Sequence, residues 1–204
     1  MIPIIDPGAA ASEAIEDAAR DLEIPTDGPH TQYPACYHPI CGDEAAERAR
    51  SVVGRGTYGY GRGGRRPQWP SPFDALGRGD CSALALAWAW GIDRFQPGRI
   101  GGDWMSTTAC WRDARGRMRM VRPVPIEDVQ IGDALDYPNL YDEHGEVARY
   151  GHCALVVGVP AGAKRFADLE VAHCHGPGGR TPAVELASGA LWDRMGGIAI
   201  RRVG

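Results

Sequence analysis

The chain has 204 residues, of which 44% are hydrophobic and 24% are charged, and this balance suits one folded domain with a modest extension. Its 22 Lys and Arg against 26 Asp and Glu give a formal net charge of −4. The best basic stretch, 62–66, lies among glycines, so we expect no nucleic-acid binding. The longest apolar run, 83–90, is too short to span a bilayer, so we also expect no membrane insertion.

Two helices are predicted in the first quarter of the chain. The first covers 9–23, where Ser12 can cap its start and Pro25 follows its end. The second runs from Asp43 to about Val53, with acidic residues first and arginines later, as the helix dipole favours. Loop-forming residues separate the two, and a glycine-rich stretch at 54–64 follows the second.

A buried helix is predicted directly after Asp80. The sequence Cys81-Ser82 is followed by ALALAWAW and then by Gly91. Ala, Leu and Trp occupy every side of this segment, which is typical of a helix surrounded by protein. Asp80 is a suitable N-terminal cap and Gly91 a suitable end.

The second half of the chain changes character. We expect 92–122 to be irregular, and short strands at 131–137, 152–159, 169–175 and 198–203, each bounded by Gly, Pro or Asp. A helix-rich half followed by a strand-rich half predicts an α+β fold with an antiparallel sheet.

Cys81 is the candidate nucleophile. The reactive form of cysteine is the thiolate, and the N-terminus of a helix and a nearby imidazolium both lower a thiol pKa. His152 heads the apolar strand HCALVVGV and is the candidate base, while His173 lies on the following strand and could orient it. His175 shares a strand face with His173 and is the alternative third member.

These segments, taken in order, resemble the NlpC-type family of cell-wall cysteine peptidases. The matching stretches cover about residues 45–204, with 1–44 as an N-terminal helical or loop extension. They are ARSVVGRGTYGYGRGG at 49–64, Asp80-Cys81-Ser82 with its apolar helix, PIEDVQIGDALDY at 125–137, GHCALVVG at 151–158 and Val171-Ala172-His173. Residues 92–122 then read as an insertion. The related CHAP amidohydrolases share the Cys-then-His order and are the second resemblance.

The resemblance implies a papain-like fold, with the Cys81 helix packed on the sheet, and hydrolysis of amide bonds in peptidoglycan stem peptides through a thioester. Cys81, His152 and His173 are then catalytic and no cofactor is needed. It also implies that Asp80, Ser82 and Tyr58 hold the free amine of the stem peptide. A carboxylate facing an ammonium group is chemically sensible, although Asp80 could instead serve only as a helix cap.

Three alternatives stay open. The same fold could act on proteins as a deamidase or acyltransferase, or could bind the wall without catalysis. Cysteines and histidines could also hold zinc, from Cys36, His38 and Cys41 or from Cys153, His173, Cys174 and His175, but we expect no metal. We expect mostly free thiols, with Cys36 and Cys41 as the best candidate pair.

The first twenty residues lack a basic region followed by an apolar stretch, so we expect no signal peptide. An enzyme that cuts the cell wall would then be synthesised in the cytoplasm. It would reach its substrate by release or delivery, as a phage lysin, a virion component or a secreted effector.

Overall fold

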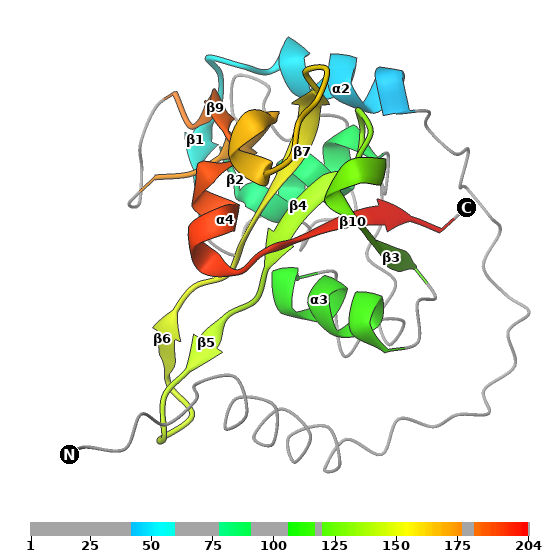
Figure 1. Cartoon of the computed structure of the whole chain (residues 1–204). Helices are drawn as coiled ribbons and strands as arrows, with labels where there is room; N and C mark the ends of the chain where they lie inside the picture. The colour runs from blue at the N-terminus through cyan, green and yellow to red at the C-terminus, as the bar shows by residue number, and fades with distance from the viewer. Residues whose placement is uncertain (1–41, 60–77, 91–105, 117–119, 177–181, 204) are drawn as a thin grey trace, which may run out of the picture. The chain divides into compact units, whose positions relative to one another are not determined.

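The computed structural model describes residues 42–59, 78–90, 106–116, 120–176 and 182–203 (Figure 1). All of them belong to one compact unit, Cys36–Gly204. The predicted helix at 9–23, nearly all of the 1–44 extension, the basic stretch 62–66 and the group Cys36, His38 and Cys41 lie outside the described residues. Among the helices in the described ranges, none is long and apolar enough to cross a membrane.

The centre of the unit is a six-stranded sheet in the order β3-β10-β4-β7-β8-β9. Every neighbouring pair in it runs antiparallel. The strands are β3 (Val121–Val124), β4 (Ala134–Tyr137), β7 (His152–Gly158), β8 (Glu170–Cys174), β9 (Val184–Ser188) and β10 (Ile198–Arg202). The predicted mixture of helices with an antiparallel sheet is therefore confirmed, and all four predicted strands belong to this sheet.

Both faces of the central strands are buried, which explains why β7 reads as a continuous apolar run. Along β7, Cys153, Leu155 and Val157 belong to one hydrophobic core, whereas Ala154 and Val156 belong to another. Side chains alternate between the two faces of a strand, so the sheet has a core on each side.

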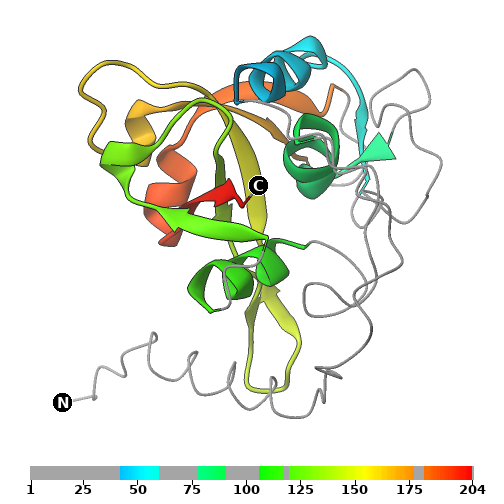
Figure 2. The ribbon, with the colours of Figure 1, turned by 90° about the vertical axis from the view of Figure 1, so that its right-hand side faces the viewer.

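Different helices cover the two faces of the sheet (Figures 1 and 2). Helix α2 (Gly42–Ser51) and the π-helix η1 (Ala83–Ala89) contact each other and β7. Helix α4 (Ala190–Met195) contacts β4 and the short 3-10 helix η3 (Phe166–Asp168), and its Trp192 belongs to the second core. The predicted helices at 43–53 and after Asp80 are both confirmed.

Smaller elements complete the described part. The short strands β1 (Thr57–Tyr58) and β2 (Arg78–Gly79) pair in parallel just before Asp80. Strands β5 (Leu140–Tyr141) and β6 (Val147–Arg149) form an antiparallel hairpin that extends beyond β4 and β7 (Figure 1). One further 3-10 helix, η2, covers Ile126–Asp128.

The expectation that 92–122 is irregular is wrong for its second half. Helix α3 (Thr107–Arg115) begins at Ser106, whose hydroxyl accepts a hydrogen bond from the Ala109 amide at 3.1 Å. The Asp113 carboxylate then accepts from the Met120 and Val121 amides at 2.8 and 2.9 Å, which ties α3 to β3. A helix this short draws its stability from tertiary packing, so its own sequence signals it weakly.

The Gly132-Asp133 turn anchors the start of β4. Gly132 has φ +91°, and a side chain there would meet the backbone of Gly42 at 2.3 Å, so only glycine fits. The buried Asp133 carboxylate accepts two hydrogen bonds from the Arg201 guanidinium, at 2.7 and 2.8 Å. These contacts join α2, β4 and β10 at one point.

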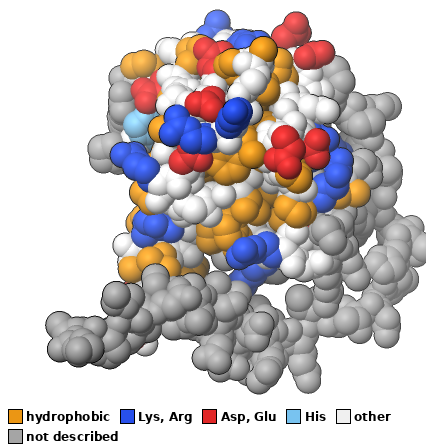
Figure 3. All heavy atoms as spheres, in the orientation of Figure 1, with side chains coloured by type: hydrophobic (Ala, Val, Ile, Leu, Met, Phe, Trp, Pro, Cys, Tyr) orange, Lys and Arg blue, Asp and Glu red, His pale blue; other side chains and the backbone are white. Residues whose placement is uncertain are grey.

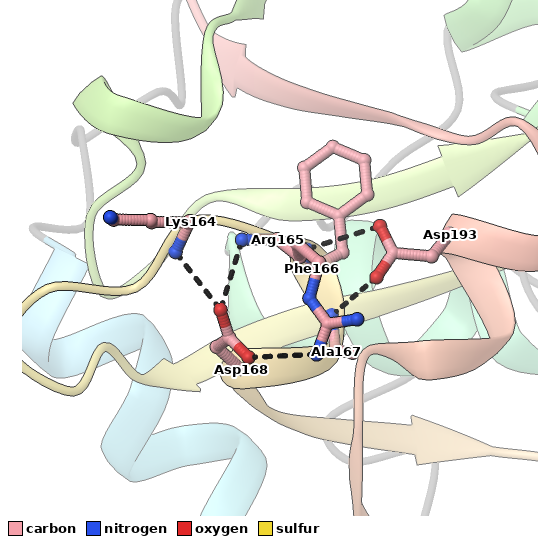
Figure 4. Close-up of polar contacts among 6 residues, drawn as sticks. All are labelled: Lys164, Arg165, Phe166, Ala167, Asp168 and Asp193. Carbon is pink, nitrogen blue, oxygen red and sulfur yellow. Dashed lines mark hydrogen bonds and ion pairs between the residues drawn. The ribbon is translucent and has the colours of Figure 1, made fainter.

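A second set of carboxylates holds α4 against the preceding loop (Figure 4). Asp193 of α4 accepts hydrogen bonds from the Phe166 and Ala167 amides at 3.2 and 2.8 Å. Asp168 closes the loop by accepting from the Lys164 and Arg165 amides at 3.0 and 3.1 Å. The first of these bonds is the main reason that the pKa of Asp168 lies below its ordinary value. These hydrogen bonds fix the loop to α4.

The surface drawn in Figure 3 mixes acidic and basic side chains over the described residues of that face. Nucleic-acid binding surfaces gather basic side chains on one face or along one stripe. The mixture on this face agrees with the small net charge.

Candidate active site

Cys81 lies at the first turn of the buried helix, as the sequence predicts. The residues Cys81 and Ser82 are helical and lead into η1, and the Leu84 amide donates to the Asp80 carbonyl at 3.2 Å. The π-helix is rare and occurs often at functional sites. Two buried leucines, Leu84 and Leu86, hold this helix on the sheet, so the position of Cys81 is set by the core.

The Cys81 thiol is surrounded by groups that stabilise its thiolate. The side chain of Cys153 hydrogen-bonds to it and is the largest cause of a pKa well below the ordinary cysteine value. Burial opposes this shift, while the charge and a hydrogen bond of His152 and the backbone amide of Cys153 add to it. The same hydrogen bond and burial raise the pKa of Cys153, so Cys81 is the more acidic thiol of the pair.

His152 is held between the nucleophile and a second imidazole. Its Nε2 lies 3.0 Å from Nδ1 of His173, which leaves its Nδ1 for the Cys81 side. On another side the ring stacks on Trp192 of α4, with centroids 5.4 Å apart and planes at 23°. Cys81, His152 and His173 expose only 8%, 8% and 6% of their surface, so little water reaches them.

His175, the alternative third member, takes a different place. Its ring centroid lies 6.4 Å from that of His152, compared with 5.3 Å for His173. Its Nε2 lies 2.5 Å from Oε1 of Glu185, and the same oxygen lies 3.5 Å from Nε2 of His173. The geometry therefore selects His173 as the neighbour of His152. The Glu185 carboxylate lies beside both His173 and His175.

Sequence reasoning missed Glu185. It lies on β9 directly opposite His173 of β8 in the antiparallel pairing. The apolar residues Val184 and Leu186 on either side of Glu185 are a weak local sign of a strand. Nothing local to that strand shows which residue it would face.

Of the three residues expected to bind substrate, Asp80 and Ser82 flank Cys81 in the sequence, and Tyr58 lies on β1, which pairs with β2 just before Asp80. The carboxylate of Asp80 accepts a hydrogen bond from the Ser82 hydroxyl at 2.7 Å, and both side chains are buried. Tyr58 pairs with Gly79 through β1 and β2, and its side chain packs against the core that contains Cys81. The Asp80 carboxylate is thus already engaged by a hydroxyl group within the protein.

Asp136 is a second group that sequence reasoning missed. It lies beside Cys153 in the pairing of β4 with β7, is fully buried, and has no hydrogen-bond partner for either carboxylate oxygen among the described residues. Burial first, and the Cys81 charge second, raise its pKa well above the ordinary value. The raised pKa favours the neutral form of the Asp136 carboxyl group, and that form would not repel a Cys81 thiolate.

The site therefore combines the acidic Cys81 thiol at the start of a helix, the His152 imidazole beside it and the His173 imidazole on the far side of His152. This set can attack a carbonyl carbon and move a proton, which are the two requirements of acyl transfer through a thioester. Among the same residues, His173, His175 and Glu185 could also hold a metal ion. Searches of family models, curated proteins and solved structures found no match to this chain.

Proposed function

We propose that this chain is a cysteine hydrolase with a papain-like arrangement of its helix and sheet. The observation that carries the proposal is the continuous series formed by Cys81, His152 and His173. The lowered pKa of Cys81 supports it, and so does the 3.0 Å contact between the two imidazoles. The resemblance of residues 45–204 to NlpC-type peptidases supplies the reaction class.

In the proposed reaction the Cys81 thiolate attacks the carbonyl carbon of an amide. Its proton is held by His152, which gives it to the leaving amine as the carbon–nitrogen bond breaks. Water then attacks the thioester with His152 as base, which regenerates the thiol and releases the acid. The Cys81 backbone amide is the candidate donor to the oxyanion.

His173 is proposed as a positioning residue. When His152 is protonated, its Nε2–H donates to Nδ1 of His173. Nε2 of His173 then carries a hydrogen and points toward Glu185, 3.5 Å away. A carboxylate beside Nε2 of His173 would fix the tautomer of that imidazole. Glu185 is therefore a candidate fourth member of the series Cys81, His152 and His173.

The proposed substrate is an amide bond in a peptidoglycan stem peptide. Tyr58, Asp80 and Ser82 would lie on the amine side of that peptide. The Asp80 carboxylate already accepts a hydrogen bond from the Ser82 hydroxyl. A bound ammonium group would therefore be a second donor to this carboxylate.

The test uses the full chain with purified peptidoglycan and mass analysis of the released fragments. Wild type is expected to release fragments with new carboxyl or amino ends, and Cys81→Ala and Cys81→Ser to release none. Cys174→Ala is the matched control, because Cys174 is another buried thiol and its Sγ donates to the Gly79 carbonyl. If activity survives in Cys81→Ala and disappears in Cys153→Ala, the nucleophile is Cys153 and the assignment to Cys81 is wrong.

If intact sacculi give no fragments, protein substrates are the next comparison. Wild-type protein that deamidates glutamine or forms acyl transfer products, with Cys81→Ser inactive, would support the same chemistry on a different substrate. If Cys81 is also no more reactive toward iodoacetamide than Cys174 at neutral pH, the catalytic proposal fails and a binding module remains.

A further inference from the structure

The edge of the sheet next to the candidate active site carries a compact group of two histidines and one glutamate. Antiparallel pairing places His173 of β8 opposite Glu185 of β9, and His175 follows two residues later. The rings of His173 and His175 lie parallel, with centroids 4.5 Å apart and planes at 11°. As a result, both Nε2 atoms face the same carboxylate oxygen.

The spacing of these three atoms suits a small metal ion. One possible ligand atom from each of the three residues lies within 4.8 Å of the other two. Zinc binds imidazole nitrogen and carboxylate oxygen at about 2.1 Å, so ligand atoms in a tetrahedral site lie about 3.4 Å apart. The separation of 3.5 Å between His173 and Glu185 already fits. The 2.5 Å between His175 and Glu185 would have to widen by about 1 Å, which a side-chain rotation allows.

The burial of the group also suits a site with one closed and one open side. The His173 side chain is 7% exposed, whereas those of His175 and Glu185 are 33% and 38% exposed. An ion could enter from the outer side and keep one position for water. Imidazole and carboxylate ligands together favour zinc and its neighbours over magnesium or calcium, which prefer oxygen.

We propose that His173, His175 and Glu185 form a binding site for a single divalent transition-metal ion, with zinc as the first candidate. This ligand set differs from the set Cys153, His173, Cys174 and His175 considered from the sequence, because Cys153 and Cys174 belong to the core on the other face of the sheet. The proposal does not depend on the hydrolase proposal. Both proposals involve His173, in different tautomers. In the catalytic series Nδ1 accepts from His152 and Nε2 carries the hydrogen, whereas with a metal on Nε2 the hydrogen would lie on Nδ1, which faces His152.

The test measures zinc and cobalt binding to the full chain in a Cys81→Ser background, which removes the most reactive thiol. We expect one zinc ion per chain by calorimetry, and a cobalt(II) spectrum without the charge-transfer absorption of thiolate ligands. Adding His175→Ala or Glu185→Gln should weaken the affinity about tenfold or more. Glu185→Gln is nearly isosteric, so it tests the ligand without removing packing.

The matched control is His144→Ala, which removes an exposed histidine from the turn between β5 and β6. It should leave zinc affinity unchanged. Lack of zinc binding to the Cys81→Ser protein would overturn the proposal. So would binding that is insensitive to both His175→Ala and Glu185→Gln, or a thiolate band in the cobalt spectrum. Because none of these readouts is an activity, they stand whether or not the chain hydrolyses amides.

Discussion

The thiols of Cys81 and Cys153 are hydrogen-bonded to each other, and this contact is the largest cause of the lowered pKa of Cys81. It brings together the start of a helix and the second residue of β7, from segments far apart in the chain. A thiol that donates to a thiolate stabilises the charged form, in the same way as any hydrogen bond to an anion. Cys153 thus has a role that its position after His152 does not suggest.

Cys153→Ala should raise the pKa of Cys81. A hydrogen bond to a charged group is worth about 1.5–3 kcal/mol, or about one to two pKa units. The midpoint of the pH profile for iodoacetamide alkylation of Cys81, followed by peptide mass analysis, should therefore move to higher pH. Cys174→Ala is the control and should leave the midpoint in place. An unchanged midpoint in Cys153→Ala would mean that the Cys153 thiol does not stabilise the Cys81 thiolate.

His152→Ala should lower the rate of amide hydrolysis by about 10²- to 10⁴-fold, the range typical of general acid–base catalysis. His173→Gln should cost less, because glutamine can still accept a hydrogen bond from His152. Steady-state rates and their pH profiles on one stem peptide check both. If His173 only fills space, His173→Gln will leave the pH profile of the reaction unchanged. A larger loss of rate in His175→Ala than in His173→Gln would reverse the assignment of the two histidines.

Asp80→Asn should lower kcat/KM for stem peptides with a free amine by about ten- to a hundred-fold, the value of one charge-assisted hydrogen bond. Acetylated peptides of the same sequence should lose much less. Asparagine keeps an acceptor for the Ser82 hydroxyl, so the local fold is preserved. Equal losses on both peptides would show that Asp80 serves only the helix start and Ser82.

Asp136→Asn should flatten the pH dependence of stability. The pKa of Asp136 is raised in the folded state above its ordinary value of 3.8, so its contribution to stability is fully present below about pH 3.8. That contribution is lost as pH rises toward the folded-state pKa, at about 1.4 kcal/mol of unfolding free energy per pH unit. Urea unfolding between about pH 5 and about pH 7 measures this slope.

The control for Asp136→Asn is Glu127→Gln, which changes an exposed acid on η2 and should keep the wild-type slope. A variant Asp136→Asn with the same slope as wild type would mean that Asp136 is charged in the folded protein. In that case it would need a partner beyond the described residues.

Asp133→Ala should destabilise the fold by about 1.5–3 kcal/mol, because it removes charge-assisted hydrogen bonds from the buried carboxylate to the partly exposed Arg201. The loss includes the two hydrogen bonds from Arg201 and one from the Gln130 amide. Chemical denaturation of full-length protein gives the value. Asp142→Ala, at an exposed turn between β5 and β6, should cost far less, and equal losses would contradict a special role for Asp133.

The sequence alone determined the elements whose signals are local. The all-round apolar run after Asp80 predicts a buried helix, and alternation with Gly, Pro and Asp boundaries predicts β4, β7, β8 and β10. These patterns depend on residues within one or two turns of each other, so they can be read without knowing the fold. The choice of Cys81 and His152 as candidates came from the same local reasoning together with a family resemblance.

The tertiary structure decided how those residues meet. Only the pairing of β8 with β9 places Glu185 opposite His173, and only the pairing of β4 with β7 places the buried Asp136 beside Cys153. Helix α3 was missed for the same reason, because its short polar sequence gains stability from the strands it contacts. Strand pairing joins residues tens of positions apart and depends on the packing of the whole core, so no local pattern specifies it.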